Sequence, residues 1–215
     1  MTTSSGQQTV LIGTTNAAKF ARYRRLLRDA FDERVAHIVS PGDVICHLHI
    51  VEDGQTAADN ACKKARGYAK ASGLATLAVD EALAIAGLPE EDQPGLHVRR
   101  YGGREQTDEE LVRVLLEKTQ HIAPSERAAI WTWALCLVVP GSGEYVEDVT
   151  IHDGLAAEVR TPIPSGYPLS AILVDTVTGK RVCELTEQEA AVRLSPVREA
   201  IDRLVQAAFI DTNAS

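Results

Sequence analysis

Apolar residues recur along the chain with two different periods, which predicts short buried strands alternating with amphipathic helices. Residues 9–13 (T-V-L-I-G) form a short apolar run typical of a buried strand. Over 16–30 apolar residues follow at helical spacing, with arginines on the opposite face, as in an amphipathic helix. Further strands are predicted at 44–51, 75–79, 128–139, 144–152 and 171–175, with a possible extension of the sheet at 155–160. Further helices are predicted at 56–72, 107–120, 187–193 and 196–209.

Local signals mark several element ends and support an α/β fold class. Thr107 and Glu110 have the spacing of a capping box at a helix start. Gly73 is placed to end the helix over 56–72, and Ser195 precedes Pro196 as a predicted N-cap. The P-G-S-G sequence between two strand patterns indicates a hairpin.

Length and charge narrow the classes of function. The chain has 215 residues, which suits one compact domain. We assign residues 1–8 to a disordered, polar N-terminal tail without a secretory signal, and 9–210 to a single two-lobed domain. The formal net charge of -8 disfavours a nucleic-acid polymer as partner but is compatible with a small polyanion such as a nucleotide. No apolar run is long enough to span a membrane.

The four cysteines include no C-x-x-C pair and lie in apolar or helical patterns. We interpret them as reduced, mostly buried thiols of a cytoplasmic protein. His47 and His49 alternate on one predicted strand, but no third ligand follows at a spacing typical of a zinc site. A half-exposed strand is the better interpretation of that pair.

Three stretches carry residues suited to phosphate chemistry. The turn from Thr14 to Lys19 (T-T-N-A-A-K) joins a strand to a helix, which aims backbone amides and a positive dipole end at one point. Glu52 follows a predicted strand, and Lys64 lies on the helix after it. Asp80 and Glu81 leave a buried strand as adjacent acids, and carboxylates are the ligands that Mg²⁺ prefers. Ordinary capping, a solvated helix face and a turn acid are the structural alternatives for the three stretches.

Taken in order, these stretches resemble the inosine triphosphate pyrophosphatase family. The family's T-G-N-x-x-K loop corresponds to T-T-N-A-A-K at 14–19, and its E-x-G-x-T-F-x-x-N-A-x-x-K-A motif to E-D-G-Q-T-A-A-D-N-A-C-K-K-A at 52–65. A-D-D-S-G-L corresponds to A-V-D-E-A-L at 78–83, and P-G-x-x-S-A-R-Y-x-G to P-G-L-H-V-R-R-Y-G-G at 94–103. Four motifs in the right order are together fairly specific.

The resemblance implies a fold, a reaction and a set of residue roles. The fold would be an elongated mixed central sheet flanked by helices, with two lobes and a cleft between them. The reaction would be Mg²⁺-dependent hydrolysis of a nucleoside triphosphate between its α and β phosphates, in a cytoplasmic homodimer. Metal ligands would be Glu52 and Asp80, and the attacking water would be oriented by Asp80 with Glu81. Substrate would contact a larger set: Thr14, Thr15, Asn16, Lys19, Lys64, Gly166, Tyr167 and Ser195.

The last third of the chain departs from the family pattern. Of the family's F-G-Y-D-P motif only Gly166 and Tyr167 remain, and of K-N-x-x-S-H-R only Ser195 remains. The family's first acid of the pair is Val79 here. Because base-reading groups are lost, we expect altered base specificity, with Arg193 or Arg198 as possible substitutes. The alternative is a catalytically weakened or inactive nucleotide-binding protein on the same fold.

Overall fold

The computed structural model describes residues 8–31, 35–44, 48–101 and 103–209. All but the last residue of the predicted tail at 1–8 lies outside the described residues, as do Cys46 and His47. Gln8 belongs to the first strand rather than to a tail.

The fold is mixed α/β, as the sequence predicts, with six strands and five α-helices among the described residues. The strands are β1 Gln8–Ile12, β2 Val35–Val39, β3 Ala75–Ile85, β4 Ala128–Val139, β5 Gly143–Leu155 and β6 Leu173–Asp175. The helices are α1 Ala17–Phe31, α2 Ala57–Ser72, α3 Asp108–Thr119, α4 Glu187–Arg193 and α5 Ser195–Phe209. No helix in the described part of the chain is both long and apolar enough to cross a membrane.

The strands form one sheet in the order β2-β1-β3-β4-β5-β6. β1 pairs in parallel with both β2 and β3, with Ile12 opposite Leu77 in the second ladder. β5 and β6 are antiparallel. β1 ends at Ile12 opposite Leu77, whereas β3 continues to Ile85, so the segment after β1 leaves the sheet beside the middle of β3. Ligands often collect at the carboxyl end of a parallel strand in α/β folds.

The chain divides into two compact units. Unit 1 comprises residues 1–80, 134–149 and 196–215, and unit 2 comprises 81–133 and 150–195. The single two-lobed domain predicted for 9–210, and the cleft within it, stay predictions.

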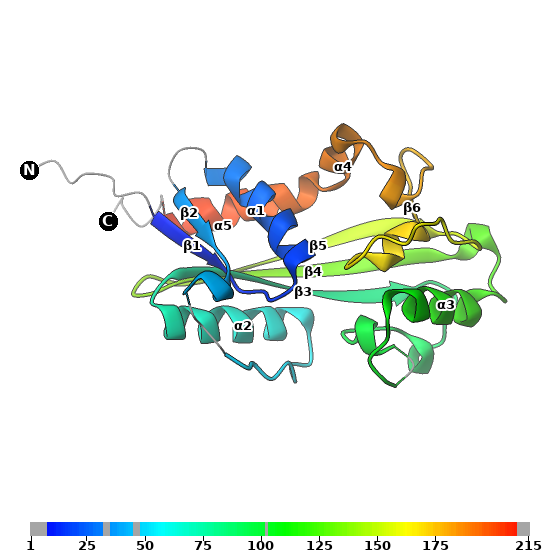
Figure 1. The fold of residues 1–215 in the computed structure, drawn as a ribbon, viewed down its shortest axis with the longest axis horizontal. Helices are drawn as coiled ribbons and strands as arrows, with labels where there is room; N and C mark the ends of the chain where they lie inside the picture. The colour runs from blue at the N-terminus through cyan, green and yellow to red at the C-terminus, as the bar shows by residue number, and fades with distance from the viewer. Residues whose placement is uncertain (1–7, 32–34, 45–47, 102, 210–215) are drawn as a thin grey trace, which may run out of the picture. The chain divides into compact units, whose positions relative to one another are not determined.

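In unit 1, helices cover both sides of the strands. Figure 1 shows α1 and α5 on one side of the sheet and α2 on the other. Each of these helices buries its apolar stripe: Tyr23, Leu26 and Leu27 of α1, Ala61, Ala65 and Tyr68 of α2, and Ile201, Leu204 and Val205 of α5 are all buried. The strand β1, with Val10, Leu11 and Ile12 buried, lies between these layers.

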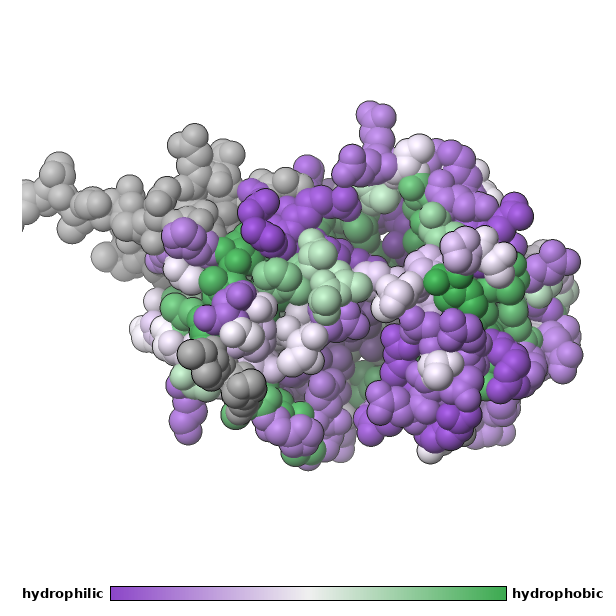
Figure 2. Space-filling model, viewed as in Figure 1, coloured by the Kyte–Doolittle hydropathy of each residue, from purple (hydrophilic) through white to green (hydrophobic). Residues whose placement is uncertain are grey.

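In unit 2, α3 is amphipathic in the way its sequence predicts. Leu111, Val112 and Leu115 are buried, whereas Glu109, Arg113 and Glu117 are exposed. Figure 2 shows this solvent face as a largely hydrophilic part of the surface. The helix begins with a capping box in which Thr107 and Glu110 satisfy each other's backbone N–H groups, as predicted.

The structure differs from four predicted elements. The strand predicted at 75–79 continues to Ile85, so Asp80 and Glu81 lie within β3 rather than after it. The predicted strand at 44–51 is wrong: Val44 ends a 3₁₀ turn, and 48–51 have no regular structure. The sheet edge beside β1 is taken instead by β2, which the sequence did not predict. Residues 156–160 do not extend the sheet, because β5 ends at Leu155. Ser195 is the first residue of α5 rather than the residue before it, a shift of one position that leaves Pro196 in the first turn.

Candidate metal and phosphate site

The structure brings Glu52, Lys64 and Asp80 together in unit 1. Lys64 Nζ lies 2.7 Å from Asp80 Oδ1 and 3.3 Å from Glu52 Oε2. The Asp80 and Lys64 side chains are only 10% and 12% exposed, whereas the Glu52 side chain is 46% exposed. The two predicted metal ligands therefore meet at one ammonium group, with Asp80 on the buried side and Glu52 on the solvent side.

Asn60 links these groups to the backbone and was not among the predicted site residues. Its side chain is buried, donates from Nδ2 to Asp80 Oδ2 at 3.1 Å, and accepts at Oδ1 from the Gly54 N–H at 2.8 Å. Asn60 thus fixes the turn that carries Glu52 against the strand that carries Asp80. The sequence holds a signal for it, because Asn60 and Lys64 are four residues apart and share a helix face.

The start of α2 is built to hold this geometry. Thr56 accepts from the Asp59 N–H, and Asp59 accepts in return from the Thr56 N–H, which closes a capping box. Gly54 has no room for a side chain, since a Cβ there would lie 2.6 Å from both Asn60 Oδ1 and Asp59 Cβ. The helix ends at Gly73 in the left-handed conformation, as predicted.

Asp53 points to a different partner from its neighbour Glu52. Its carboxylate lies 2.5 Å from Lys63 Nζ and is largely exposed. The hydrogen bond and the charge of Lys63 hold the pKa of Asp53 below its usual value. Asp53 therefore forms a solvated ion pair with Lys63 beside the site and is not part of the site.

The Thr14–Lys19 turn connects β1 to α1 where β1 ends beside the middle of β3. The Gly13 N–H donates to the Leu77 carbonyl at 2.8 Å, which extends the ladder between the two strands. Gly13 is closely packed, because a Cβ there would lie 2.9 Å from the Tyr68 ring of α2. The turn therefore begins beside Leu77 of β3, three residues before Asp80 in the same strand.

Asn16 caps α1 with its own side chain. Its Oδ1 accepts from the backbone N–H groups of Ala18 at 2.9 Å and Lys19 at 3.0 Å, while its N–H donates to Thr14 Oγ1 at 3.2 Å. The capping interpretation of Asn16 therefore holds whether or not a ligand binds. Among the described residues, the backbone N–H of exposed Thr15 has no protein acceptor, which leaves a donor at the helix start for an anion.

Glu81 is the next residue of β3 after Asp80. Successive side chains of a strand point to opposite faces, so regular strand geometry turns Glu81 away from the face that Asp80 uses. Its catalytic role stays a prediction.

The remaining predicted substrate residues, Gly166, Tyr167 and Ser195, belong to unit 2. Gly166 has a φ of 79°, and its N–H donates to Asp108 Oδ2 at 3.0 Å. Burial acts to raise the pKa of Asp108, but the ion pair with Arg99 and this N–H outweigh it and hold the pKa below its usual value. The loop bearing Gly166 and Tyr167 is thus tied to the first turn of α3, and the substrate contacts of all three residues stay predictions.

Arg193 and Arg198, the two arginines named as substitutes for the lost motif, differ in whether their side chains are already engaged in the protein. Arg193 has a side chain that is only 8% exposed, and it donates two hydrogen bonds to the buried carboxylate of Asp153, at 3.0 and 2.5 Å. Its guanidinium is therefore committed to a structural ion pair. Arg198 is exposed on α5 in unit 1.

In the P-G-L-H-V-R-R-Y-G-G motif, Tyr101 has a packing role and Arg100 is exposed. Tyr101 is buried, and its hydroxyl donates to the Asp92 carbonyl at 2.7 Å. Burial raises the pKa of Tyr101 to about 12. Arg100 is close to His97, with 3.0 Å between Nη2 and Nδ1.

Comparison with known proteins identifies the family of this chain. Residues 10–207 match the sequence model of the Ham1 family. A dITP/XTP pyrophosphatase of Corynebacterium efficiens is 31% identical over 184 residues, which cover 84% of this chain and 87% of that protein. A dITP/XTP pyrophosphatase of Streptomyces coelicolor is 32% identical over 182 residues, which cover 84% and 87%.

A solved structure supports the same assignment. The crystal structure of a nucleoside-triphosphatase, or dITP/XTP pyrophosphatase, from Mycobacterium abscessus is 28% identical and has a TM-score of 0.66 over 92% of this chain and 98% of that one. The chain therefore belongs to the Ham1 family, which confirms the resemblance to the inosine triphosphate pyrophosphatase family that its motifs carry.

Proposed function

We propose that this chain is a Mg²⁺-dependent nucleoside triphosphate pyrophosphohydrolase that cleaves between the α and β phosphates. The observation that carries the proposal is the meeting of Glu52 and Asp80 at the Lys64 ammonium. Relatives named dITP/XTP pyrophosphatases in Corynebacterium efficiens and Streptomyces coelicolor support the reaction type.

The residues present suit a hard divalent cation. Glu52 and Asp80 offer only oxygen donors, and Glu52 is exposed enough to leave room for the waters that Mg²⁺ retains. Each carboxylate oxygen of Asp80 accepts one bond, from Asn60 or Lys64, which leaves further lone pairs on the same group. When bound, the ion neutralises phosphate charge and lowers the pKa of coordinated water. Glu52 and Asp80 would hold it.

The polar residues of unit 1 would divide the remaining work. Asp80, oriented by Asn60, would position the attacking water and accept its proton. Lys64 would exchange its carboxylate partners for phosphate oxygens, so that its charge stabilises the transition state. Thr14, Thr15, Asn16 and Lys19 would hold the outer phosphates at the start of α1, where backbone N–H groups and the helix dipole favour anions.

We further propose that the preferred base differs from hypoxanthine or xanthine. The family's Lys, His and Arg before the last helix are absent, and Arg193 is held by Asp153. A mismatch in a base-reading site costs about 1–3 kcal/mol per unpaired buried group. Loss of several such groups is therefore enough to change the ranking of substrates. Gly166, Tyr167 and Ser195 are the remaining candidates for contacts to the base.

A panel of nucleoside triphosphates tests the proposal. Purified protein with Mg²⁺ is incubated with standard, deaminated and modified-base triphosphates, and pyrophosphate and orthophosphate are measured separately. We expect pyrophosphate and a nucleoside monophosphate from at least one member. Orthophosphate as the first product would overturn the proposed bond. Tight binding without turnover across the panel would favour the inactive nucleotide-binding alternative.

Gly54→Ala is expected to lower turnover by about tenfold or more while the protein stays folded. The new Cβ would overlap Asn60 Oδ1 and Asp59 Cβ, so the turn must move and the Gly54–Asn60 bond is lost. Displacing a positioned catalytic group by about 1 Å costs as much as 10²-fold in rate. Steady-state pyrophosphate release checks this result. Gly42→Ala is the matched control, since the nearest atom to its Cβ would be 3.7 Å away; equal activity of the two variants would contradict the role of the turn.

The family resemblance also motivates two lesser proposals, a homodimer and a cytoplasmic location. Sedimentation equilibrium of the purified chain tests the first, and a monomer at micromolar concentration would contradict it. Fractionation of the native cells tests the second.

A further inference from the structure

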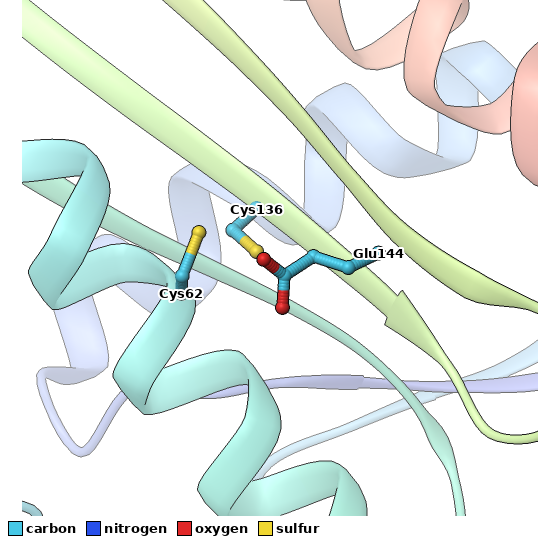
Figure 3. A group of neighbouring side chains, drawn as sticks. All are labelled: Cys62, Cys136 and Glu144. Atoms are coloured by element: carbon cyan, nitrogen blue, oxygen red, sulfur yellow. The ribbon is translucent and has the colours of Figure 1, made fainter.

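A second cluster of ligand-type side chains lies in unit 1, outside the predicted metal site. Cys62 of α2, Cys136 of β4 and Glu144 of β5 each place a sulfur or carboxylate oxygen within 4.8 Å of the others. Figure 3 shows the three side chains turned toward one another from a helix and two strands. Both cysteines are buried and neither is in a disulfide.

Arg66 supports the carboxylate of this cluster. It lies one turn after Cys62 on α2 and donates to Glu144 through Nε at 2.5 Å and Nη2 at 2.6 Å. The Glu144 side chain is 29% exposed, so the cluster has buried sulfurs on one side and a route to water on the other. A ligating carboxylate held by a further hydrogen-bonding group is the usual arrangement around protein-bound metals.

We propose that Cys62, Cys136 and Glu144 bind a thiophilic divalent cation of the zinc class, with water as the fourth ligand. Two sulfurs and one carboxylate oxygen, plus an open position, match the donor types and number that zinc accepts. Zinc–sulfur and zinc–oxygen bonds of about 2.0–2.3 Å place tetrahedral ligands a little under 4 Å apart. The observed separations therefore need only small side-chain rotations.

Charges and protons balance when such an ion binds. Burial raises the pKa of both thiols, so they carry their protons at neutral pH, and Glu144 is balanced by Arg66. Binding converts each S–H to a zinc–thiolate bond and releases two protons to solvent, with no change of oxidation state. The charges of the dication and two thiolates cancel, so the Arg66–Glu144 pair stays balanced.

This cluster is distinct from the site of the proposed function, although α2 carries parts of both. Asn60 and Lys64 contact Asp80 of β3, whereas Cys62 and Arg66 contact residues of β4 and β5. An ion in the cluster would join α2 to two strands without contacting Glu52 or Asp80. Its test therefore does not depend on catalysis.

The test is a zinc titration in a Cys46→Ser/Cys183→Ser background, in which Cys62 and Cys136 are the only remaining cysteines. Excess Mg²⁺ is present so that the hard-cation site does not compete. Calorimetry in two buffers of different protonation enthalpy is expected to give one zinc per chain and release of about two protons. Substituting Co²⁺ for zinc should produce thiolate-to-cobalt absorption, and zinc should raise the melting temperature.

Single substitutions in the Cys46→Ser/Cys183→Ser protein identify the residues that bind zinc. Cys62→Ser is expected to weaken zinc binding by about 100-fold or more, and Glu144→Gln by about 10- to 100-fold. Glu147→Gln is the matched control, because Glu147 lies on the same strand and pairs with Arg203 outside the cluster; it should bind zinc like the background protein. If Cys62→Ser does not fold, Glu144→Gln against Glu147→Gln decides.

Four results would overturn the proposal. The first is a zinc affinity that neither Cys62→Ser nor Glu144→Gln changes, and the second is the absence of a thiolate-to-cobalt absorption band. The third is zinc binding that is lost in His47→Ala/His49→Ala, and the fourth is zinc binding that is lost in Asp80→Asn alone. The last two would assign the ion to the histidine pair or to the carboxylate site.

Discussion

Asp80→Asn is expected to reduce pyrophosphate release by at least about 10³-fold, within the range that removal of a positioned acid–base group produces. The side chain keeps its size, but it loses the charge that Lys64 contacts at 2.7 Å and one of its two acceptor oxygens. If the new amide nitrogen takes the place of Oδ2, it faces the donor Asn60 Nδ2, and if it takes the place of Oδ1, it faces the donor Lys64 Nζ. In both orientations two donors face each other and one hydrogen bond is lost. Either orientation also removes a ligand for a divalent cation.

The fold should survive this change. Leaving a buried donor unpaired costs about 1–3 kcal/mol, which is less than the stability of an ordinary domain. Pyrophosphate release at saturating substrate and Mg²⁺ measures the effect, with circular dichroism as the check on folding. Asp53→Asn is the control, since this exposed acid pairs with Lys63 and should keep near-normal turnover. Turnover of Asp80→Asn within a few-fold of the parent would refute the mechanism.

Arg193→Met is expected to destabilise the protein by about 3–5 kcal/mol, the usual effect of removing one partner from a buried ion pair. The Arg193 and Asp153 side chains are only 8% and 1% exposed, so the carboxylate left behind is cut off from water. For a chain of this size the loss corresponds to a fall in melting temperature of roughly 6–20 °C.

Two further variants separate this effect from a general loss of arginine. Arg203→Met breaks an ion pair with Glu147 whose side chains are 54% and 27% exposed, and it should cost under about 1 kcal/mol. The double variant Arg193→Met/Asp153→Leu should recover much of the loss, because apolar side chains of similar volume often replace a buried pair without penalty. Urea unfolding gives all three values; equal losses for Arg193→Met and Arg203→Met would show that burial of the pair is unimportant.

Sequence reasoning predicted the elements that carry strong local signals. The α3 start follows from Thr107 and Glu110, and the end of α2 from Gly73, because caps act within a few residues. The pattern over 44–51 looked like a strand, but alternation cannot show whether a neighbouring strand is available for pairing. The short edge strand β2 was missed for the same reason, since its pairing with β1 is a tertiary contact.

The residues of the candidate site could be predicted from the sequence, but the hydrogen bonds that link them could not. Motif order indicated Glu52, Lys64 and Asp80, and the structure brings these three together. The bridge through Asn60 depends on a helix–strand contact across 20 positions of sequence, which spacing alone does not reveal. Likewise, the ion pair of Arg193 with Asp153 spans 40 positions and engages a guanidinium that the sequence left as a candidate for base contact.

The composition of unit 1 bears on how the protein is made. Glu52, Asn60, Lys64 and Asp80 all lie within the first 80 residues, yet the unit also needs residues 134–149 and 196–215. Helix α5 supplies the buried side chains of Val197, Ile201 and Leu204. On the ribosome, where chains emerge from the N-terminus, Glu52, Asn60, Lys64 and Asp80 are translated before α5. The apolar core of unit 1 is complete only after α5 has left the exit tunnel, so the four residues can take up their final arrangement only once this later helix has folded.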